Sequence, residues 1–507
     1  MNVLFIHSYL ESLGVEYLSS YLKRNGHEVE LFFDPRTFDN SFLKIERLSK
    51  HFDTTPYLLD HLKRFKPDIA AFSITTYDFQ WALKKAHLVK EFNSDVRVIF
   101  GGTHPTLCPE VVISKPEVDA LCIGEGELPL LMYVENINKK DLNYQIPNLW
   151  IKDGERIIKN KVLFINEDLD TLPLPDKNLF YEINPPLQRI YYILHGRGCP
   201  FGCSYCRHNV LHKYYKNRKY VRRRSVDNVI RELIQAKKDY NIKEIHFPDA
   251  IFGLGDEDYL KDLLRQYSRE VNVPFKINSH SRFLTEDICR LLKEANCIYI
   301  QIGVQTVDES YRTNILHRPE KNKDYVKAVR LLRKYNLTFS LDHILNMPLE
   351  KEESYKKAAL FYNKLRPNFI GVFWLGYFPN TDMTKFALKE GILSEQDNQS
   401  ICEGLTAFRI SAAEMGGKDY FNKHKKYYNY WFWMEILPLI PEKIFDSLFN
   451  RLYKWPKKPP VIIVRIIRIL NKIRIGDTFL FLHNIALCIA GIRKYYYRKL
   501  RMKKRAG

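Results

Sequence analysis

Short apolar runs alternate with amphipathic stretches over the first 140 residues of the chain. The apolar runs are typical of buried strands, whereas the stretches between them have the three-to-four-residue spacing of helices. This β-α-β order predicts an α/β domain with a parallel, doubly wound sheet that binds ligands at the carboxyl ends of its strands. Strands are expected at residues 3–7, 28–33, 69–73, 96–100 and 120–123, and helices at 14–25, 79–92 and 127–135.

A second region of alternating strands and helices follows a segment with several prolines. Residues 141–185, which contain Pro147, Pro173 and Pro175, are expected to form a linker. From residue 186 to 395, six apolar runs alternate with helical patterns, which predicts a partial (β/α)6 barrel of the TIM type with its chemistry at the carboxyl ends of the strands. The expected strands are residues 191–194, 244–247, 276–280, 298–302, 339–345 and 369–375.

The last region, residues 396–507, is expected to be helical and is both basic and apolar. From Lys418 onward it carries 21 Lys and Arg against 5 Asp and Glu, so most of the net charge of +20 lies here. Residues 461–475 show a broad apolar helical pattern with a narrow basic stripe. Residues 478–492 are mostly apolar but shorter than the ~20 residues that span a bilayer. Three interpretations compete: helices lying on an anionic membrane surface, which we favour, a soluble cap on the barrel, and an RNA-binding patch.

The length and the cysteines indicate a multidomain protein of a reducing compartment. A chain of 507 residues is too long for one hydrophobic core. Six of the nine cysteines are isolated, so a disulfide scaffold is not expected. The N-terminal residues enter a strand pattern without a basic segment or a cleavage site, so no signal peptide is expected. We therefore expect a cytoplasmic protein, peripheral at the inner face of the membrane if the C-terminal region binds lipid.

The other three cysteines, Cys199, Cys203 and Cys206, form a Cys-x3-Cys-x2-Cys arrangement. Three thiolates can hold three corners of a [4Fe–4S] cluster and leave the fourth iron open, whereas an electron-transfer cluster is normally closed by four cysteines. The alternatives are a partial disulfide framework and a zinc knuckle, which usually needs a further Cys or His at a regular offset. His208 is close, but the chain has no second CxxC pair, so the cluster is the preferred interpretation.

This spacing, with Arg197 and Gly198 before it and Tyr205 just before the third cysteine, resembles the signature of the radical S-adenosylmethionine (SAM) superfamily. The resemblance implies that the three cysteines are the metal ligands at the catalytic centre. It implies that SAM binds the open iron through its amino and carboxylate groups, and that reduction of the cluster yields methionine and a 5′-deoxyadenosyl radical. Tyr205 is expected to pack near the adenine of SAM.

Further motifs follow the expected barrel strands in the order found in this superfamily. Asp249 belongs to a Phe-Pro-Asp-Ala-Ile-Phe motif, Ser281 and Arg282 match a Ser-Arg pair, and Gln305 replaces the glutamate of Ile-Gly-Ile-Glu-Ser. The resemblance implies that these four residues contact SAM, with Ser281 and Arg282 as donors to its carboxylate or ribose. Gln305 keeps a hydrogen-bonding carbonyl but lacks the charge of glutamate.

Besides Gln305, three further positions depart from the superfamily pattern. Ala250 stands where the family has a second acid after Asp249, so only Asp249 carries over. Asn346 replaces the glycine of a Gly-x-Pro-x-Glu motif, and Asn380 replaces the glycine of Pro-Gly-Thr. The motifs nevertheless follow the cysteine loop in the order found in the superfamily, which argues against a chance match.

The turns after the N-terminal strands resemble those of the cobalamin-binding domain that precedes many radical SAM barrels. Their small and hydroxyl side chains allow the backbone to approach a large flat ligand. Over nearly all of residues 1–140, the resemblance implies that the first βα loop, a Ser-x-Thr turn, a Gly-Gly turn and a Gly-Glu turn face the corrin or its nucleotide tail. The residues concerned are Gly14, Ser73, Thr75, Gly101, Gly102, Thr103, Gly124 and Glu125.

The first of these loops lacks a cobalt ligand found in related domains. Cobalamin domains of the methionine-synthase kind carry Asp-x-His-x-x-Gly, and the histidine binds cobalt from below. Aligned on Gly14, this chain has Glu11 at the histidine position. Radical SAM proteins with cobalamin often lack this histidine, so the lower axial ligand stays open. His7 and His104 are candidates, although an isolated histidine near a turn is more often structural.

Together these resemblances imply a cobalamin-dependent radical SAM enzyme of the BchE-like or methyltransferase type. The expected cofactors are a [4Fe–4S] cluster, SAM and cobalamin, with a flavodoxin or ferredoxin as electron donor. Methylation of an unactivated carbon is favoured over ring formation by a cyclase, and a non-catalytic cobalamin sensor is the remaining alternative. A tRNA methylthiotransferase needs three further upstream cysteines, but only Cys108 and Cys122 precede Cys199. The C-terminal region favours a small lipid or isoprenoid substrate over nucleic acid.

Overall fold

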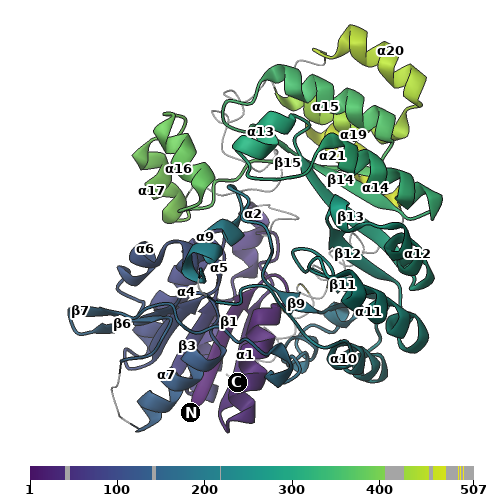
Figure 1. The fold of residues 1–507 in the computed structure, drawn as a ribbon. Helices are drawn as coiled ribbons and strands as arrows, with labels where there is room; N and C mark the ends of the chain where they lie inside the picture. The colour runs from purple at the N-terminus through teal and green to yellow at the C-terminus, as the bar shows by residue number, and fades with distance from the viewer. Residues whose placement is uncertain are drawn as a thin grey trace.

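The computed structural model describes residues 1–39, 46–139, 144–216, 218–405, 427–455 and 461–475, together with residues 489, 492 and 495. These residues form an N-terminal α/β domain, a partial barrel and a set of C-terminal helices (Figure 1). Most of the apolar run 478–492 and the basic residues that follow it lie outside the described residues, so the structure does not test those expectations.

A seven-stranded sheet forms the N-terminal domain. Its strands are β1 (Asn2–Ser8), β2 (Glu28–Asp34), β3 (Ile69–Ser73), β4 (Arg97–Gly101), β5 (Ala120–Cys122), β6 (Leu149–Asp153) and β7 (Arg156–Lys159). Their order is β2-β1-β3-β4-β5-β6-β7, with the first five parallel and the last two antiparallel. Strands β6 and β7 lie within the range expected to be a linker, and they extend the first sheet at one edge.

Helices cover both faces of this sheet because both faces are apolar. Val3 and Phe5 of β1 belong to one hydrophobic cluster, whereas Leu4 and Ile6 belong to another on the opposite face. This arrangement confirms the doubly wound sheet. The helices are α1 (Leu13–Arg24), α2 (Glu46–Ser49), α3 (Thr55–Phe65), α4 (Phe79–Phe92), α5 (Thr103–Leu107), α6 (Pro109–Ile113) and α7 (Glu127–Lys139).

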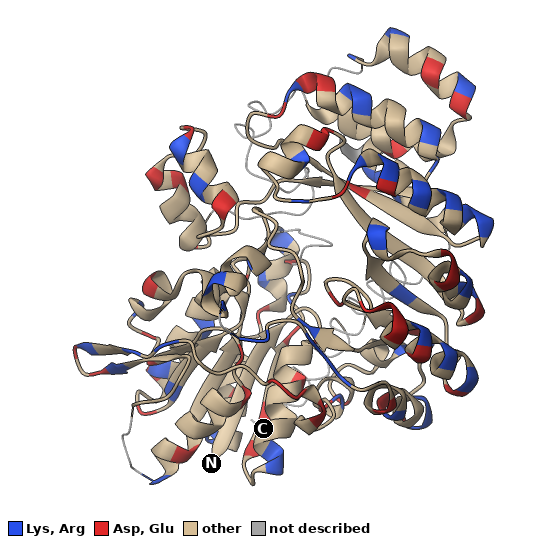
Figure 2. Ribbon diagram, in the orientation of Figure 1, with Lys and Arg blue, Asp and Glu red and all other residues tan. Residues whose placement is uncertain are grey.

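Six parallel strands form the partial barrel, as the sequence predicts. They are β8 (Ile190–Tyr192), β11 (Glu244–Phe247), β12 (Phe275–Ser279), β13 (Cys297–Gln305), β14 (Phe339–Leu345) and β15 (Phe369–Trp374), in the order β15-β14-β13-β12-β11-β8. Helices lie on the outer side, where Figure 2 shows most of their charged residues. These helices are α10 (Val226–Asp239), α11 (Glu257–Glu270), α12 (Glu286–Glu294), α13 (Glu309–Asn314), α14 (Asn322–Lys334) and α15 (Glu352–Leu365).

The N-terminal domain and the barrel share a continuous hydrophobic core. Phe180 of α8 (Asn178–Tyr181) packs edge-on against Phe33 of β2, with ring centroids 6.0 Å apart. Phe33, Phe180 and Tyr191 of the first barrel strand belong to one buried cluster. The two domains are therefore held together by apolar packing as well as by the polar contacts of the site.

Two segments outside the barrel complete the fold. Helices α16 (Asp382–Lys389) and α17 (Glu395–Cys402) lie near the N-terminal domain (Figure 1), and Glu403 forms an ion pair of 2.6 Å with Lys115. Helices α19 (Tyr428–Ile436), α20 (Glu442–Leu452) and α21 (Val461–Arg474) pack near the barrel edge, where Arg468 donates a hydrogen bond to the Val372 carbonyl oxygen at 2.9 Å. Within the described part of the chain, no helix is long and apolar enough to cross a membrane.

Candidate functional site

The three clustered cysteines lie on the loop between β9 (Gly196–Arg197) and α9 (Arg207–Tyr214). Cys199 and Cys203 are buried, Cys206 is half-buried, and all three thiols are free. Neighbouring segments hold the loop from two sides. The Ser204 hydroxyl donates to the Ile315 carbonyl oxygen at 2.6 Å, and the Met383 backbone N–H donates to the Ser204 carbonyl oxygen at 2.9 Å.

The surroundings of these thiols fit an iron–sulfur cluster. Burial raises the pKa of Cys199 to about 12 and that of Cys203 to about 11, so their thiolates need nearby positive charge. Coordination to iron supplies it. No group of three or more His, Cys, Asp or Glu side chains in the described residues could hold a single metal ion. Thiolates that bind three different irons of a cubane need not converge on one ion.

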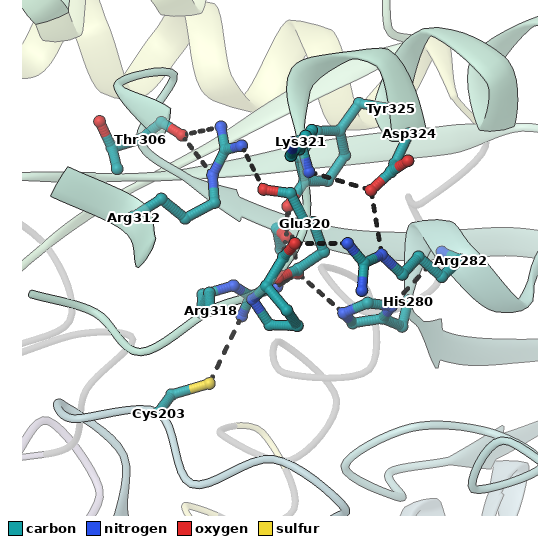
Figure 3. A network of polar contacts seen from close by, with 12 residues as sticks. Cys203, His280, Arg282, Thr306, Arg312, Arg318, Glu320, Lys321, Asp324 and Tyr325 are labelled. Carbon is teal, nitrogen blue, oxygen red and sulfur yellow. Dashed lines mark hydrogen bonds and ion pairs between the residues drawn. The ribbon is translucent and has the colours of Figure 1, made fainter. Parts of the chain in front are cut away.

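Arg318 lies over the cysteine loop in a buried polar network (Figure 3). Its Nη1 atom is 4.0 Å from Cys203 Sγ and 3.1 Å from the Tyr205 hydroxyl oxygen. Its Nη2 atom donates to the Gly303 carbonyl oxygen at 2.9 Å and to the Glu320 carboxylate. The guanidinium is therefore fixed in place beside the cysteines, with donors available to an anionic group.

Glu320 is the carboxylate that fixes this guanidinium. Its Oε1 atom is 2.8 Å from His280 Nε2, and the Tyr325 hydroxyl donates to it at 3.2 Å. Burial alone would raise the pKa of Glu320, but His280 and Arg318 lower it to about 2. Sequence reasoning missed Arg318 and Glu320 because they lie in a loop well beyond the end of β13. The compact polar run His-Arg-Pro-Glu at residues 317–320 is the signal that could have found them.

The five residues expected to contact SAM have different surroundings. The Tyr205 ring packs in an apolar cluster with Leu316 and Ile344. The Asp249 carboxylate accepts a hydrogen bond from the Gly196 backbone N–H at 3.1 Å and lies 2.8 Å from His195 Nδ1, so it fixes the start of β9.

The two residues of the Ser-Arg pair differ in burial and in contacts. Ser281 is buried, and its hydroxyl has no hydrogen-bond partner among the described residues. The Arg282 side chain is 41% exposed and forms an ion pair of 3.0 Å with Asp324. The structure therefore places Ser281, but not the Arg282 guanidinium, where it faces the buried interior.

Gln305 and the two asparagine replacements occupy left-handed backbone positions. The pairing of β13 with β14 is irregular between Gly303 and Gln305, and Gln305 has a φ of 69°. Bulges of this kind redirect side chains next to active sites. Asn346 and Asn380 have φ values of 64° and 62°. Asparagine tolerates this region better than most residues, so both replacements preserve turns that would otherwise favour glycine.

Two adjoining cavities lie between the N-terminal sheet and the barrel. The first, of about 240 Å³, is lined by residues that include Ser73 and Arg197 of β9, and the second, of about 270 Å³, by residues that include Asp249 and Arg207. Of the eight residues expected to contact cobalamin, seven line one cavity or both: Gly14, Ser73, Gly101, Gly102, Thr103, Gly124 and Glu125. Thr75 does not line either cavity, and its hydroxyl donates to Asp78 Oδ2 at 2.7 Å.

Two of these glycines are required by close packing. Gly102 has a φ of 96°, and a Cβ there would lie 2.7 Å from the Ile74 carbonyl oxygen. Gly124 has a φ of 80°, and a Cβ would meet the hydroxyl of Tyr215, the residue that follows α9. Glycine at these two positions lets the turns that line the cavities pack closely against neighbouring segments.

Glu125 connects the two domains at the cavities. Its carboxylate forms ion pairs with Arg222 at 2.5 Å and with Arg197 at 3.4 Å, while Arg197 also contacts Glu127 at 2.6 Å. Burial alone would raise the pKa of Glu125, but the two arginines reverse this effect and the pKa lies below its ordinary value. The carboxylate thus serves as an interdomain contact within the cavity wall.

Glu11, at the position of the missing histidine, does not line either cavity. Its carboxylate forms a buried ion pair of 3.0 Å with Lys177, which also lies 2.8 Å from Glu16. His7 and His104 are also absent from the lining, and burial lowers the pKa of both, that of His104 to about 4. His208 of α9 lines the second cavity and is 2.5 Å from the Tyr220 hydroxyl.

Comparison with known proteins identifies both domains. Residues 193–362 match the family model of the radical SAM superfamily, and residues 3–132 match that of the B12 binding domain. The chain therefore carries a radical SAM domain and a cobalamin-binding domain. It is a radical SAM enzyme whose cofactors are a [4Fe–4S] cluster, SAM and cobalamin.

Particular relatives cover most of the chain. An uncharacterised methyltransferase of Pyrococcus horikoshii is 26% identical over 387 residues, which cover 75% of this chain and 79% of that protein. The anaerobic magnesium-protoporphyrin IX monomethyl ester cyclase of Rubrivivax gelatinosus is 23% identical, covering 71% of this chain and 65% of its own length, just under two thirds. The cobalamin-dependent SAM radical enzyme OxsB with aqua-cobalamin bound shares the fold, with a TM-score of 0.66, 14% identity and coverage of 98% of this chain and 84% of that one.

Proposed function

We propose that this enzyme transfers a methyl group from SAM to an unactivated carbon of a small hydrophobic substrate. One observation supports the proposal above the others: the loops of the cobalamin domain line two adjoining cavities together with residues at the two ends of the cysteine loop, Arg197 before it and Arg207 after it. Gly102, Gly124 and Arg197 are common to both cavities. A cobalamin bound at the glycine turns would therefore lie next to the segment that carries the cysteines and the SAM bound there.

The roles of the residues follow from their places in the site. Cys199, Cys203 and Cys206 would hold the cluster, and Tyr205 would pack against the adenine of SAM. Arg318, held by Glu320, is oriented to bind the SAM carboxylate through charge-assisted hydrogen bonds. When bound, the cluster and SAM supply the 5′-deoxyadenosyl radical, and cobalamin supplies a methyl carrier.

The overall reaction balances with two SAM molecules and two electrons. One SAM gives up its methyl group and becomes S-adenosylhomocysteine. The other becomes methionine and 5′-deoxyadenosine, which takes the hydrogen atom that leaves the substrate carbon. A reduced flavodoxin or ferredoxin is the proposed source of both electrons, and the new carbon–carbon bond replaces the carbon–hydrogen bond of the substrate.

Anaerobic incubation with methyl-deuterated SAM and an extract of the host cells tests the proposal. Mass spectrometry should show a labelled methyl group in a product, together with 5′-deoxyadenosine and S-adenosylhomocysteine. If 5′-deoxyadenosine forms without label in any product, the cyclase or another radical outcome is favoured instead. If the reconstituted protein forms no 5′-deoxyadenosine at all, it is the sensor that the sequence left as an alternative.

We further propose that the C-terminal helices bring the enzyme to an anionic lipid surface. On α21, Val464 and Asn471 are buried, whereas Ile466 and Leu470 are each 50% exposed and Ile473 is 51% exposed. The same helix carries Lys472 and Arg474 in its last turn. An apolar face beside cations suits the interface of an anionic bilayer, and a substrate dissolved in that bilayer would be nearby.

Vesicle flotation separates this proposal from a soluble helical cap. The protein should float with phosphatidylglycerol vesicles at low salt and be released by high salt or by replacement with phosphatidylcholine. A double substitution, Ile466→Asp with Leu470→Asp, should abolish flotation without loss of the cluster. Equal recovery in the soluble fraction under every condition would leave the cap interpretation in place.

A further inference from the structure

One carboxylate inside the barrel has no role in the site described above. Asp342 lies in the middle of β14, and its register partners are glycines on both sides, Gly303 of β13 and Gly371 of β15. The next residue, His343, points outward, since its Nδ1 atom is 2.9 Å from the Tyr362 hydroxyl of helix α15. Alternate strand residues face opposite sides, so Asp342 faces the barrel interior.

The two glycines make room for polar side chains inside the barrel. A Cβ at Gly371 would lie 2.2 Å from Asp342 Oδ1, and a Cβ at Gly303 would lie 2.4 Å from Gln305 Nε2, so the carboxylate and the Gln305 amide occupy the places that side chains there would fill. Gln301, Gly303 and Phe373 are only half-buried although their strands form the barrel wall. The barrel interior next to Asp342 is therefore partly open, although the carboxylate itself is buried.

Asp342 has an oxygen atom that nothing in the described residues satisfies. The Gln301 amide donates to Oδ2 at 2.5 Å, whereas Oδ1 is buried without a hydrogen-bond partner. Leaving such an oxygen unpaired is costly, so each case calls for an explanation. Burial raises the pKa of this carboxyl to about 7, and Gln301 and Arg468 offset only part of that effect.

The carboxylate also lies close to the cofactor site. Its register partner Gly303 accepts a hydrogen bond from Arg318 through its carbonyl oxygen, and the same guanidinium is 4.0 Å from Cys203 Sγ. Figure 3 shows Arg318 between Cys203 and the barrel wall. Asp342 is thus one strand away from the group that lies over the cysteine loop.

We propose that Asp342 accepts a hydrogen bond from a hydroxyl or amino group of the substrate and so positions the substrate in the barrel next to SAM. The inference rests on the proposed function only in requiring a substrate for the radical, and it holds for methylation and for ring formation alike. A ribose hydroxyl of SAM offers the same donor chemistry. The experiment must therefore separate substrate binding from SAM binding.

The test compares full-length, anaerobically reconstituted wild type with Asp342→Asn and with a matched control, Asp239→Asn. Asp239 also accepts a hydrogen bond from a glutamine amide, Gln235, but on the exposed face of α10. Three quantities are measured: SAM affinity, the slow formation of 5′-deoxyadenosine with SAM and reductant alone, and the stimulation of that rate by host-cell extract. Stimulation reports substrate binding whether or not a methyl group is transferred.

Asp342→Asn should keep the cluster, the SAM affinity and the substrate-free rate within about twofold of wild type. The extract concentration needed for half-maximal stimulation should rise about 10- to 100-fold, as expected when a hydrogen bond to a charged group is lost. Asp239→Asn should match wild type throughout. Weaker SAM binding in Asp342→Asn would assign the contact to SAM, and an unchanged response to extract would exclude any contact; either result overturns the proposal. If the extract stimulates the wild type but no product carries the methyl label, the result counts against methyl transfer and not against the role of Asp342.

Discussion

At the scale of single residues, the sequence motif points to Arg282 as the arginine that binds SAM, whereas in the structure Arg318 lies beside the cysteines. Arg282 belongs to the Ser-Arg motif, but its side chain pairs with Asp324 and is 41% exposed. Arg318 belongs to no motif, yet its side chain is 11% exposed, pairs with Glu320 and reaches the cysteine loop. Because Arg318 lies beside the thiols, we expect it, rather than Arg282, to bind an anionic group of SAM.

Substitution of each arginine by alanine tests this assignment. Arg318→Ala should weaken SAM binding about 10- to 100-fold, because it removes charge-assisted hydrogen bonds in a buried site. Arg282→Ala should change SAM affinity less than about threefold, because an exposed ion pair contributes little. Equilibrium dialysis of the reconstituted proteins measures both, with iron content as the check that the cluster is retained. A larger loss in Arg282→Ala than in Arg318→Ala would contradict the assignment.

Glu350 gives a prediction about pH at the same scale. It is buried and accepts a hydrogen bond from the Thr306 hydroxyl, and burial raises its pKa from 4.5 to about 7. A carboxyl group with a raised pKa in the folded state contributes stability that is complete below pH 4.5 and is lost as the pH rises through 7.

Glu350→Gln should therefore lose less stability than wild type as the pH rises from 4.5 to 8. The difference in the free energy of unfolding between the two proteins should change by up to about 3 kcal/mol over this range. Denaturant titrations of the cofactor-free proteins at several pH values measure this difference. The contributions of titratable groups common to both proteins cancel in it. Parallel profiles would show that Glu350 does not titrate in this window.

At the scale of elements, the end of β4 and the turn after it contain two adjacent glycines, and only the second is at a position that a larger residue could not occupy without strain. Gly101 has ordinary surroundings, since a Cβ there would lie 3.8 Å from its nearest neighbour, Cys122 Cβ. Gly102 has a positive φ and would place a Cβ 2.7 Å from a backbone oxygen. The sequence pattern Gly-Gly does not distinguish the two.

Gly102→Ala should lower the free energy of unfolding by about 1–3 kcal/mol, the cost of backbone strain at such a position. Gly101→Ala should lower it by less than about 1 kcal/mol, which makes it the matched control. Chemical denaturation without cofactors provides the measurement, so any effect on cobalamin binding is kept apart. Equal losses in the two variants would mean that the turn rearranges to accept a side chain at 102.

At the scale of the whole molecule, buried ion pairs join the cobalamin domain to the barrel. Arg222 has a side chain that is 1% exposed and pairs with Glu125, which is 14% exposed. The pair between Lys213 and Asp382 is more exposed, at 48% and 34%. Removing one partner of a buried pair leaves the other charge uncompensated, whereas an exposed charge is solvated by water.

Arg222→Met should destabilise the folded protein by about 3–5 kcal/mol and speed limited proteolysis of the segment between the domains. Lys213→Met should cost less than about 1 kcal/mol and leave proteolysis unchanged. Adding Glu125→Gln to Arg222→Met should recover part of the loss, because it removes a carboxylate that has lost its nearer partner and keeps only Arg197 at 3.4 Å. No recovery in the double variant would indicate that Arg222 acts through packing instead.

Most of the architecture could be predicted because periodicity is a local property of the chain. The expected strands at 69–73, 244–247 and 339–345 coincide with β3, β11 and β14, and the expected helix at 79–92 coincides with α4. Strands β6 and β7 were missed since they are short and lie in a segment with prolines. The hairpin they form depends on pairing with β5, which is a contact distant in sequence.

The sequence by itself determined the components of the site: three cysteines at cluster spacing, glycine turns after buried strands, and the order of strands and helices. These features are local, because a thiolate loop or a tight turn is specified by neighbouring residues. Only the tertiary structure decided which charges meet. Arg318 lies next to Cys203, Glu125 forms an ion pair with Arg222, and Glu11 forms one with Lys177. Asp342 lies between two glycines. Each of these depends on burial and on segments far apart in the chain, which bring together side chains that no sequence spacing connects.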